Sequence, residues 1–360
     1  MKKSTRKLAR SAIGVACCFS GLAHGQANVI VYGELDVGVA RFSNVGMNGN
    51  GAVTSLYSGL NNPSYLGFKG VESLGNGIET FFVLESGVAV TSGGLANGNG
   101  NLWGRLANLG VSGPLGSLTI GLQLDPYLLS VILTDPRGLS GAGSAFNTYA
   151  GSATYGILNS KIGSTPIVGI RDSNAIGYTT PTIGGFQATI LYGIGEVAGN
   201  ASAGAYLSAN AFYDKGPVFL TSAYFQGNDN AGVKVAKNMR VGAGYSFNPG
   251  VKINLSYDVR KKPSTGESVD EIGGGTSGLI SPQLSYSMGA YRSENRENRS
   301  DRATTYAAGL TYFLSKRTSL YGAISRLKMA TARSRRTLSA WVRSPDYWQT
   351  ASFQMVPASV

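Results

Sequence analysis

The chain has 360 residues, of which 51 are glycine and 19 are tyrosine, and only 14% are charged. Five positive charges lie in residues 2–10 and a net +4 lies in residues 328–360, so residues 26–327 carry only +3 of the formal +12. Because the positive charge gathers at the two ends, with no basic patch interleaved with aromatic residues, the composition does not indicate nucleic-acid binding.

Residues 1–25 have the organisation of a secretory signal peptide. Five basic residues in 2–10 precede a short apolar stretch, 11–23, and Ala23-His24-Gly25 is a small-x-small cleavage site. A membrane-spanning helix needs about 20 apolar residues, and this stretch is shorter. We therefore expect export and removal of residues 1–25.

Removal of this segment also removes reactive side chains. Cys17, Cys18 and His24 are the only cysteines and the only histidine of the chain. Without a thiol or an imidazole, the mature chain cannot form disulfides, zinc sites with Cys or His ligands, or Ser-His-Asp triads. We expect no enzyme activity and no cofactor or metal.

The first strand is predicted over residues 28–42, where apolar and polar residues alternate. Side chains on a strand alternate faces. One face carries Val29, Val31, Leu35, Val37 and Val39, and the other carries Tyr32, Glu34 and Asp36. This pattern recurs almost to the C-terminus, and no stretch after residue 25 has the 18 consecutive apolar residues of a membrane helix.

Further strands are expected in chain order, separated by alternately long and short connections. They cover about 64–71, 78–90, 102–112, 117–124, 173–180, 186–195, 204–213, 218–226, 238–247, a strand ending near 260, 283–291, 304–313 and 319–327. Long connections follow odd strands and short turns follow even ones, as when one side of a membrane receives loops and the other receives tight turns. This parity requires one more weak strand, expected within 271–280.

The predicted fold class is all-β: a transmembrane antiparallel β-barrel of sixteen strands, fifteen of them recognisable by residue 327. The barrel domain is 26–327, with a long segment at about 125–172, and 328–360 is an atypical tail in place of the last loop and closing strand. Alternation fades there and arginines cluster. We hypothesise a frameshift near codon 328, with 335–345 as a makeshift strand.

Five segments resemble the general porins of Gram-negative β-proteobacteria. They are Val31-Tyr-Gly-Glu-Leu-Asp-Val-Gly38, Leu66-Gly-Phe-Lys-Gly-Val-Glu-Ser-Leu-Gly75, Phe82-Val-Leu-Glu-Ser-Gly87, the stretch 185–200 and Leu314-Ser-Lys-Arg-Thr-Ser-Leu-Tyr-Gly322. The resemblance spans about residues 1–328 and implies a trimeric, passive outer-membrane channel for ions and small polar solutes. The alternatives are an assembly-defective product or another outer-membrane barrel such as a translocator.

The resemblance also implies that the third external loop, about 125–172, folds inward and narrows the pore between basic wall residues and acidic loop residues. By position, Lys69 and Arg105 are the wall cations, and Asp125 and Asp135 are the loop acids. The family usually has arginine where this chain has Tyr65, and Gly-Arg-Gln-Tyr where it reads Gly121-Leu-Gln-Leu124. Selectivity for anions therefore does not carry over.

Alternation predicts which other residues face the lumen. Tyr65, Glu34, Asp36 and Glu85 are expected on its wall, and Arg137 is offered by the inward loop. The run 260–262 is expected to be solvated or to face lipopolysaccharide phosphates. Expected partners are other copies of the chain in a homotrimer, outer-membrane lipid and lipopolysaccharide, the barrel assembly machinery and small polar solutes, with no nucleic acid.

Overall fold

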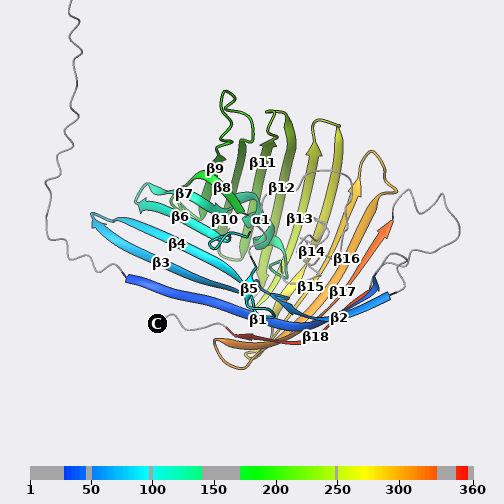
Figure 1. Ribbon diagram of the computed structural model, residues 1–360. Coiled ribbons are helices and arrows are strands. Elements are labelled where there is room, and N and C mark those ends of the chain that lie inside the picture. The colour runs from blue at the N-terminus through cyan, green and yellow to red at the C-terminus, as the bar shows by residue number, and fades with distance from the viewer. Residues whose placement is uncertain are drawn as a thin grey trace, which may run out of the picture.

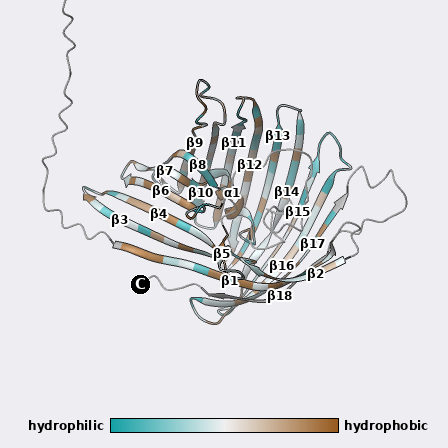
Figure 2. Ribbon diagram, viewed as in Figure 1, coloured by the Kyte–Doolittle hydropathy of each residue, from teal (hydrophilic) through white to brown (hydrophobic). Residues whose placement is uncertain are grey.

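Side chains alternate between two environments along the strands, as β13 (Val251–Lys262) shows most clearly. Its buried residues are polar and its exposed residues are apolar. The buried set is Asn254, Ser256, Asp258 and Arg260, and the exposed set is Ile253, Leu255 and Tyr257. Figure 2 shows apolar and polar residues interleaved along the other strands too. A polar inside and an apolar outside are expected of a barrel that faces lipid.

The computed structural model describes residues 28–45, 51–96, 100–139, 171–247, 250–330 and 346–355. Besides β13, the elements are β1 (Asn28–Val45), β2 (Gly51–Ser58), β3 (Tyr65–Gly75), β4 (Ile78–Ala89), β5 (Gly94–Leu95), β6 (Leu106–Gly113), β7 (Gly116–Leu124), α1 (Pro126–Thr134), β8 (Arg171–Thr179), β9 (Phe186–Gly193), β10 (Tyr206–Lys215), β11 (Val218–Asn228), β12 (Lys234–Phe247), β14 (Glu267–Ser281), β15 (Leu284–Asn295), β16 (Arg302–Phe313), β17 (Thr318–Ala330) and β18 (Asp346–Met355).

These strands form one antiparallel sheet that closes on itself (Figure 1). β1 pairs with β3 on one side and with β18 on the other, and each remaining strand of the ring pairs with its neighbours. Of the 18 strands in the sheet, β2 and β5 lie outside this ring, which leaves sixteen. The predicted sixteen-stranded antiparallel barrel is confirmed.

Connection lengths follow the predicted parity. β3 and β4 are joined by a tight turn at Gly75, Asn76 and Gly77, all with positive φ, which glycine and asparagine adopt most readily. The weak strand expected within 271–280 is the middle of β14, which pairs with both β13 and β15. The glycines 273–275 explain why this strand is hard to recognise, since they contribute no side-chain alternation.

The first long connection, expected to be a loop throughout, contains a strand. β2 folds back on the outer half of β1, with Val37 opposite Ser58 and Arg41 opposite Thr54. Apolar and polar residues alternate over only a short stretch of β2, and the preceding residues are rich in glycine and asparagine, which is typical of a loop. Two strands therefore share one edge of β1: β3 pairs with Asn28–Glu34, and β2 pairs with the residues from Val37 onward.

The closing position is occupied by β18, which lies later in the chain than the expected makeshift strand at 335–345. β18 pairs with β1 from Leu35 to Phe42 and with β17 from Thr318 to Arg326. Both ladders contain an irregularity, between Gly38 and Ala40 on β1 and between Tyr321 and Ile324 on β17. These irregularities accompany the weak alternation of this segment in the sequence.

Three expectations concern residues outside the described part of the chain. They are the signal peptide at 1–25, the makeshift strand at 335–345 and the part of the inward loop from 140 to 170. Among the described residues, no helix is long and apolar enough to cross a bilayer.

The helix α1 opens the third long connection and lies inside the curve of the sheet (Figure 1). It contacts β9, β10, β11, β12 and β13. Tyr127, Leu128 and Val131 are buried on this side with Ala223, Phe225 and Tyr291 of the wall. Ser130 and Thr221 share a hydrogen bond of 2.9 Å. The first part of the inward loop is therefore fixed to one side of the barrel.

Closure by β18 can be tested with cysteine pairs in residues 26–360, a segment that contains no cysteine of its own. Val37 lies opposite Phe353, so V37C/F353C is expected to form a disulfide in the folded barrel. The control pair V37C/V342C tests the expected strand at 335–345. Gel mobility after oxidation reports the bond. Cross-linking of only the control pair would overturn the observed closure.

Candidate functional site: the lumen constriction

A cluster of charged and aromatic side chains lines the wall formed by β1, β3, β4 and the start of β6. Arg105 Nε lies 3.3 Å from Glu85 Oε2, and the Tyr32 hydroxyl donates a 2.8 Å hydrogen bond to Glu85 Oε1. The Arg105 guanidinium lies over the Tyr65 ring at 4.6 Å, and Lys69 Nζ lies 5.1 Å from the centre of the Tyr32 ring. These five residues form the wall cluster, which holds its cations over aromatic faces.

The position of Tyr32 depends on a glycine in the neighbouring strand. Tyr32 lies opposite Gly67 in the β1–β3 ladder, and a Cβ atom at Gly67 would lie 2.6 Å from the Tyr32 ring. The missing side chain lets the ring lie across β3 toward Glu85. The sequence alone does not indicate Tyr32 as a site residue, because a tyrosine on a lumen face gives no signal by itself.

Arg171, the first residue of β8, is a third cation near the wall cluster. It is half-buried, and the charges of Arg105 and Glu85 both act on it. The sequence alone does not indicate Arg171, because it lies at the junction of the long third connection and a strand expected to begin at residue 173.

Glu34 and Asp36 both hold the first connection against the wall. Asp36 is fully buried and accepts hydrogen bonds from the backbone N–H groups of Asn61 and Asn62, at 2.8 and 2.7 Å. The hydroxyl of Tyr321 donates a third bond of 2.5 Å to Asp36, which joins β17 to β1. Glu34 accepts a 2.8 Å bond from the Asn62 side chain. Asp36 therefore has a structural role and is not exposed on the lumen surface.

Asp125 is the N-cap of α1 and is fully buried. Its carboxylate accepts bonds from the backbone N–H groups of Tyr127 and Leu128, at 2.6 and 3.3 Å. The Ser208 hydroxyl of β10 donates another, at 2.8 Å. Aspartate is favoured at this position because it satisfies N–H groups that lack partners within the helix. Asp125 thus starts the helix and joins it to the wall.

Asp135 has the same kind of role at the other end of α1. Its carboxylate accepts bonds from the backbone N–H groups of Arg137 and Leu139, at 2.9 and 3.1 Å, and from the Tyr291 hydroxyl at 2.5 Å. The Arg137 guanidinium reaches Ser287 of β15 at 3.4 Å. Asp135 and Arg137 are both buried, so they anchor the loop to the wall behind it.

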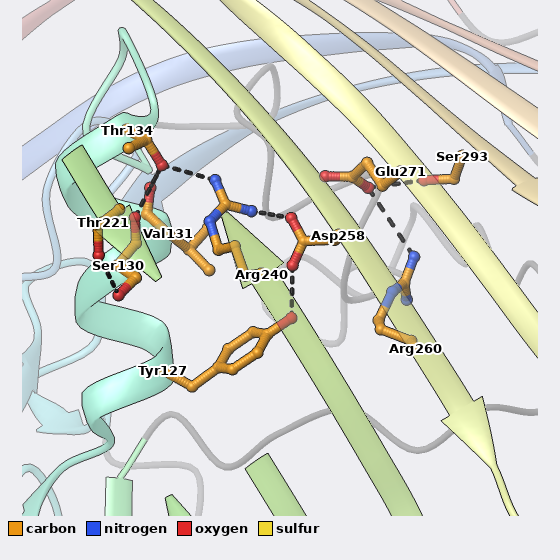
Figure 3. Close-up of polar contacts among 10 residues, drawn as sticks. All are labelled: Tyr127, Ser130, Val131, Thr134, Thr221, Arg240, Asp258, Arg260, Glu271 and Ser293. Atoms are coloured by element: carbon orange, nitrogen blue, oxygen red, sulfur yellow. Dashed lines mark hydrogen bonds and ion pairs between the residues drawn. The ribbon is translucent and has the colours of Figure 1, made fainter. Parts of the chain in front are cut away.

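A buried ion pair ties both ends of α1 to β12 and β13 (Figure 3). Arg240 and Asp258 form this pair with fully buried side chains. The Tyr127 hydroxyl donates a 2.5 Å bond to Asp258, and Arg240 donates a 2.7 Å bond to the Thr134 hydroxyl. These four residues form the helix clamp. A single charged pair thereby fixes both the first and the last turn of α1.

A second buried pair lies beside the helix clamp. Arg260 and Glu271 approach to 3.9 Å, and the Ser293 hydroxyl donates a 2.6 Å bond to Glu271 (Figure 3). Arg260 is buried inside the barrel, so the expectation that the run 260–262 is solvated or faces lipopolysaccharide is wrong for this residue. Alternation places Arg260 on the same face as Asp258, and only Lys261 of the run is exposed.

The structure separates the predicted site residues into two groups on opposite sides of the barrel. Tyr65, Lys69, Glu85 and Arg105 come together on the wall of β3, β4 and the start of β6, and Glu34 lies near them on β1. Asp125, Asp135 and Arg137 lie with α1 against the far wall. In a ring of sixteen strands, β4 and β13 are eight positions apart, so these walls face each other.

The fold and the lumen together define a closed transmembrane barrel with a helix held against the inner wall. Comparison with known proteins agrees with this class. The family model described as Gram-negative porin matches residues 11–330. Outer membrane porin protein 32 of Delftia acidovorans is 28% identical over 346 residues, covering 91% of this chain and 90% of that protein.

Further similarities point the same way. The major outer membrane protein P.IB of Neisseria meningitidis serogroup A is 26% identical, covering 89% of this chain and 91% of that protein. The solved anion-selective porin from Comamonas acidovorans aligns with a TM-score of 0.75 and 23% identity, covering 92% of this chain and all of that one. The chain belongs to the Gram-negative porin family.

This chain is thus an outer-membrane porin, a diffusion channel for ions and small solutes. The predicted family, fold class, location and channel function are confirmed. Family membership also confirms that the chain is a channel and not an enzyme.

Mutations of the helix clamp are expected to loosen α1. D258A leaves the Arg240 charge buried without its partner, which costs about 3–5 kcal/mol of stability. Y127F removes only one hydroxyl and costs about 1–3 kcal/mol. We expect a lower temperature of unfolding on gels and noisier open-channel current in planar bilayers, larger for D258A.

The control is Y224F, which removes a hydroxyl bonded to Gln226 on the outer face. It is expected to leave both measurements unchanged. An open-channel current in D258A as quiet as that of the unmodified protein would contradict the role of the helix clamp.

Proposed function

We propose that the narrowest part of this porin lies between the wall cluster and α1, and that it passes small anions in mild preference to cations. The observation that carries this proposal is the placement of the acids. Asp125 and Asp135 are buried at the ends of α1, so neither presents a carboxylate to the lumen. The acidic side of a transverse field between loop and wall is therefore missing, and only the basic residues of the wall contribute to it.

The rest of the inward loop adds little negative charge. Residues 126–134 contain no charged side chain, and residues 138–170 contain only Lys161. The half-buried side chains of α1 include Leu129 and Leu133. The side of the constriction formed by α1 is thus apolar, and the opposite wall, which carries the wall cluster, sets the local potential.

The charges on that wall are nearly balanced, with a small positive excess. Lys69, Arg105 and Arg171 contribute three positive charges, and Glu34 and Glu85 contribute two negative ones, when the buried Asp36 and Asp172 are left out of the count. Because Glu85 is bonded by both Arg105 and Tyr32, its negative charge is held close to a cation. An excess of one charge supports a mild preference, not strict selectivity. The similar porin from Comamonas acidovorans is described as anion-selective, which agrees with the proposed preference for anions.

We also propose that the functional unit is a homotrimer in the outer membrane, in contact with lipid and lipopolysaccharide and inserted by the barrel assembly machinery. A solved relative, OmpT of Vibrio cholerae, is described in a trimer form. The many large apolar side chains exposed on the outer face of the isolated chain support burial against lipid or another subunit. Resistance of a trimer band to SDS before heating, and its loss on boiling, tests this assembly.

The charge of the wall cluster predicts how substitutions change selectivity. R105A and R171A each remove a positive charge and are expected to shift the reversal potential in a salt gradient toward cations. E85Q removes a negative charge and is expected to shift it toward anions. Planar-bilayer recording across a tenfold potassium chloride gradient measures both directions.

The matched control is R317A, an exposed arginine in the turn between β16 and β17, outside the lumen. It is expected to leave the reversal potential unchanged. If R317A shifts selectivity as much as R105A, total charge and not the wall cluster determines ion preference, and the proposed constriction is overturned.

A further inference from the structure

Two buried carboxyl groups lie together where the third long connection leaves the barrel wall and returns to it. Asp125 directly follows β7, and Asp172 is the second residue of β8, so the two flank the connection. Their side chains lie within hydrogen-bonding reach of each other. Asp125 is 0% exposed and Asp172 is 7% exposed, so little water reaches either group. A bond between them would join the start of the connection to its end.

The backbone ladder between β7 and β8 stops just short of this contact. Gln123 lies opposite Asp172 and Leu124 lies opposite Arg171, which are the last pairs of the ladder in the described part of the chain. The next residue, Asp125, already caps α1. The side chains of Asp125 and Asp172 are therefore placed to make the next link between the two strands.

Hydrogen-bond donors reach only part of this pair. Oδ1 of Asp125 accepts bonds from the backbone N–H groups of Tyr127 and Leu128 and from the Ser208 hydroxyl. Oδ2 of Asp125 and Oδ2 of Asp172 are buried, and neither accepts a bond from an N–H or O–H group of the described residues. A buried acceptor without a donor is costly. A hydrogen atom held between the two carboxyl groups would satisfy both atoms.

The titratable groups around the pair do not supply that hydrogen. Tyr206 of β10 lies close enough for both carboxyl groups to act on it, but its hydroxyl donates a 2.6 Å bond to the backbone carbonyl of Ser173. Arg171 precedes Asp172 in the chain, but the charges that act on its guanidinium belong to the wall cluster. Among the described residues, Asp125 is the charged group that acts on Asp172.

Two carboxyl groups in contact inside a protein resist ionising together. Burial disfavours each charged form, and the first negative charge opposes the second. The hydrogen bonds show which group keeps its charge. Asp125 accepts three bonds at Oδ1, and accepted bonds stabilise a carboxylate. The proton therefore belongs on Asp172, with its O–H directed at Asp125.

We propose that Asp125 and Asp172 share one proton, which Asp172 carries and donates to Asp125, and that this carboxyl latch holds the two ends of the third connection together. In alkaline solution the proton passes to hydroxide, which becomes water, and two adjacent buried carboxylates remain. Their repulsion opposes the contact. Because Asp125 is also the N-cap, the first turn of α1 then loosens from the wall.

The direction of the pH dependence follows from the proton count. An exposed aspartate of the unfolded chain has lost its proton at neutral pH, whereas the folded latch still holds one. A folded state that binds the extra proton loses stability as the pH rises. The contribution of the latch is therefore greatest at acidic pH, and it falls as the solution becomes alkaline.

Infrared spectroscopy of the full mature porin, refolded in detergent, tests the shared proton. A protonated carboxyl has a C=O stretching band that a carboxylate lacks. We expect this band at neutral pH in the unmodified porin, its weakening in alkaline solution, and its weakening already at neutral pH in D172N. The matched control is D214N, which changes an exposed aspartate near the end of β10 and leaves the band unchanged. An unchanged band in D172N would overturn the proposal.

Open-channel current in planar bilayers tests the role of the proton as a latch. Raising the pH from neutral to alkaline is expected to increase the current noise reversibly in the unmodified porin and in D214N. D172N and D125N each leave one carboxylate and one amide that donates to it, and asparagine also serves as an N-cap. Both variants are thus expected to lose this response. If either folded variant keeps the full response, the latch is overturned.

A metal ion between two carboxylates is the alternative way to hold this pair together. Removing divalent ions with a chelator at neutral pH is expected to change neither the noise nor the temperature of unfolding. If the chelator loosens the unmodified porin but not D172N, an ion joins the pair and the proposal fails. The latch rests on the fold and not on the proposed ion preference, which is tested separately by the reversal potential.

Discussion

The closed hydrogen-bonded ring is the constraint on which the rest of this structure depends. An unpaired backbone group in hydrocarbon costs several kcal/mol, so a sheet with open edges cannot remain in the membrane. β1 meets this constraint with three partners, since β3 and β2 share one edge and β18 covers the other. The most regular strand of the sequence thus depends for its second edge on one of the least regular, β18.

Closure also decides what the interior can contain. A ring of sixteen strands encloses water, so its inward side chains are polar, and many of them are used to hold the inserted helix. The carboxylates of Asp125 and Asp135 bind backbone N–H groups, and Asp258 binds a tyrosine hydroxyl and an arginine. A count of acidic residues in the loop would therefore overstate the negative charge that reaches the pore.

The sequence predicts the barrel better than it predicts the site, for a physical reason. Alternation and turn chemistry are local, so they identify the strands and even require β14, whose glycines obscure it. The helix clamp joins Tyr127 to a residue 131 positions away, and Tyr291 reaches Asp135 across 156 positions. Such contacts follow from closure and loop insertion, which local patterns do not encode. Arg171 is not predicted because it lies at the start of a strand that the local pattern begins two residues later, and β2 is not predicted because its alternation is short and lies next to residues typical of loops.

The same alternation that builds the lumen also builds a second chemical surface facing the membrane. Along β17, Tyr321 and Ser325 turn inward while Ile324 and Arg326 turn outward, so each strand contributes to both surfaces. Small residues have different consequences on the two faces. Inside, Gly67 makes room for Tyr32 to reach Glu85, whereas outside, Gly274 and Ala308 leave a hollow on the face of β14, β15, β16 and β17.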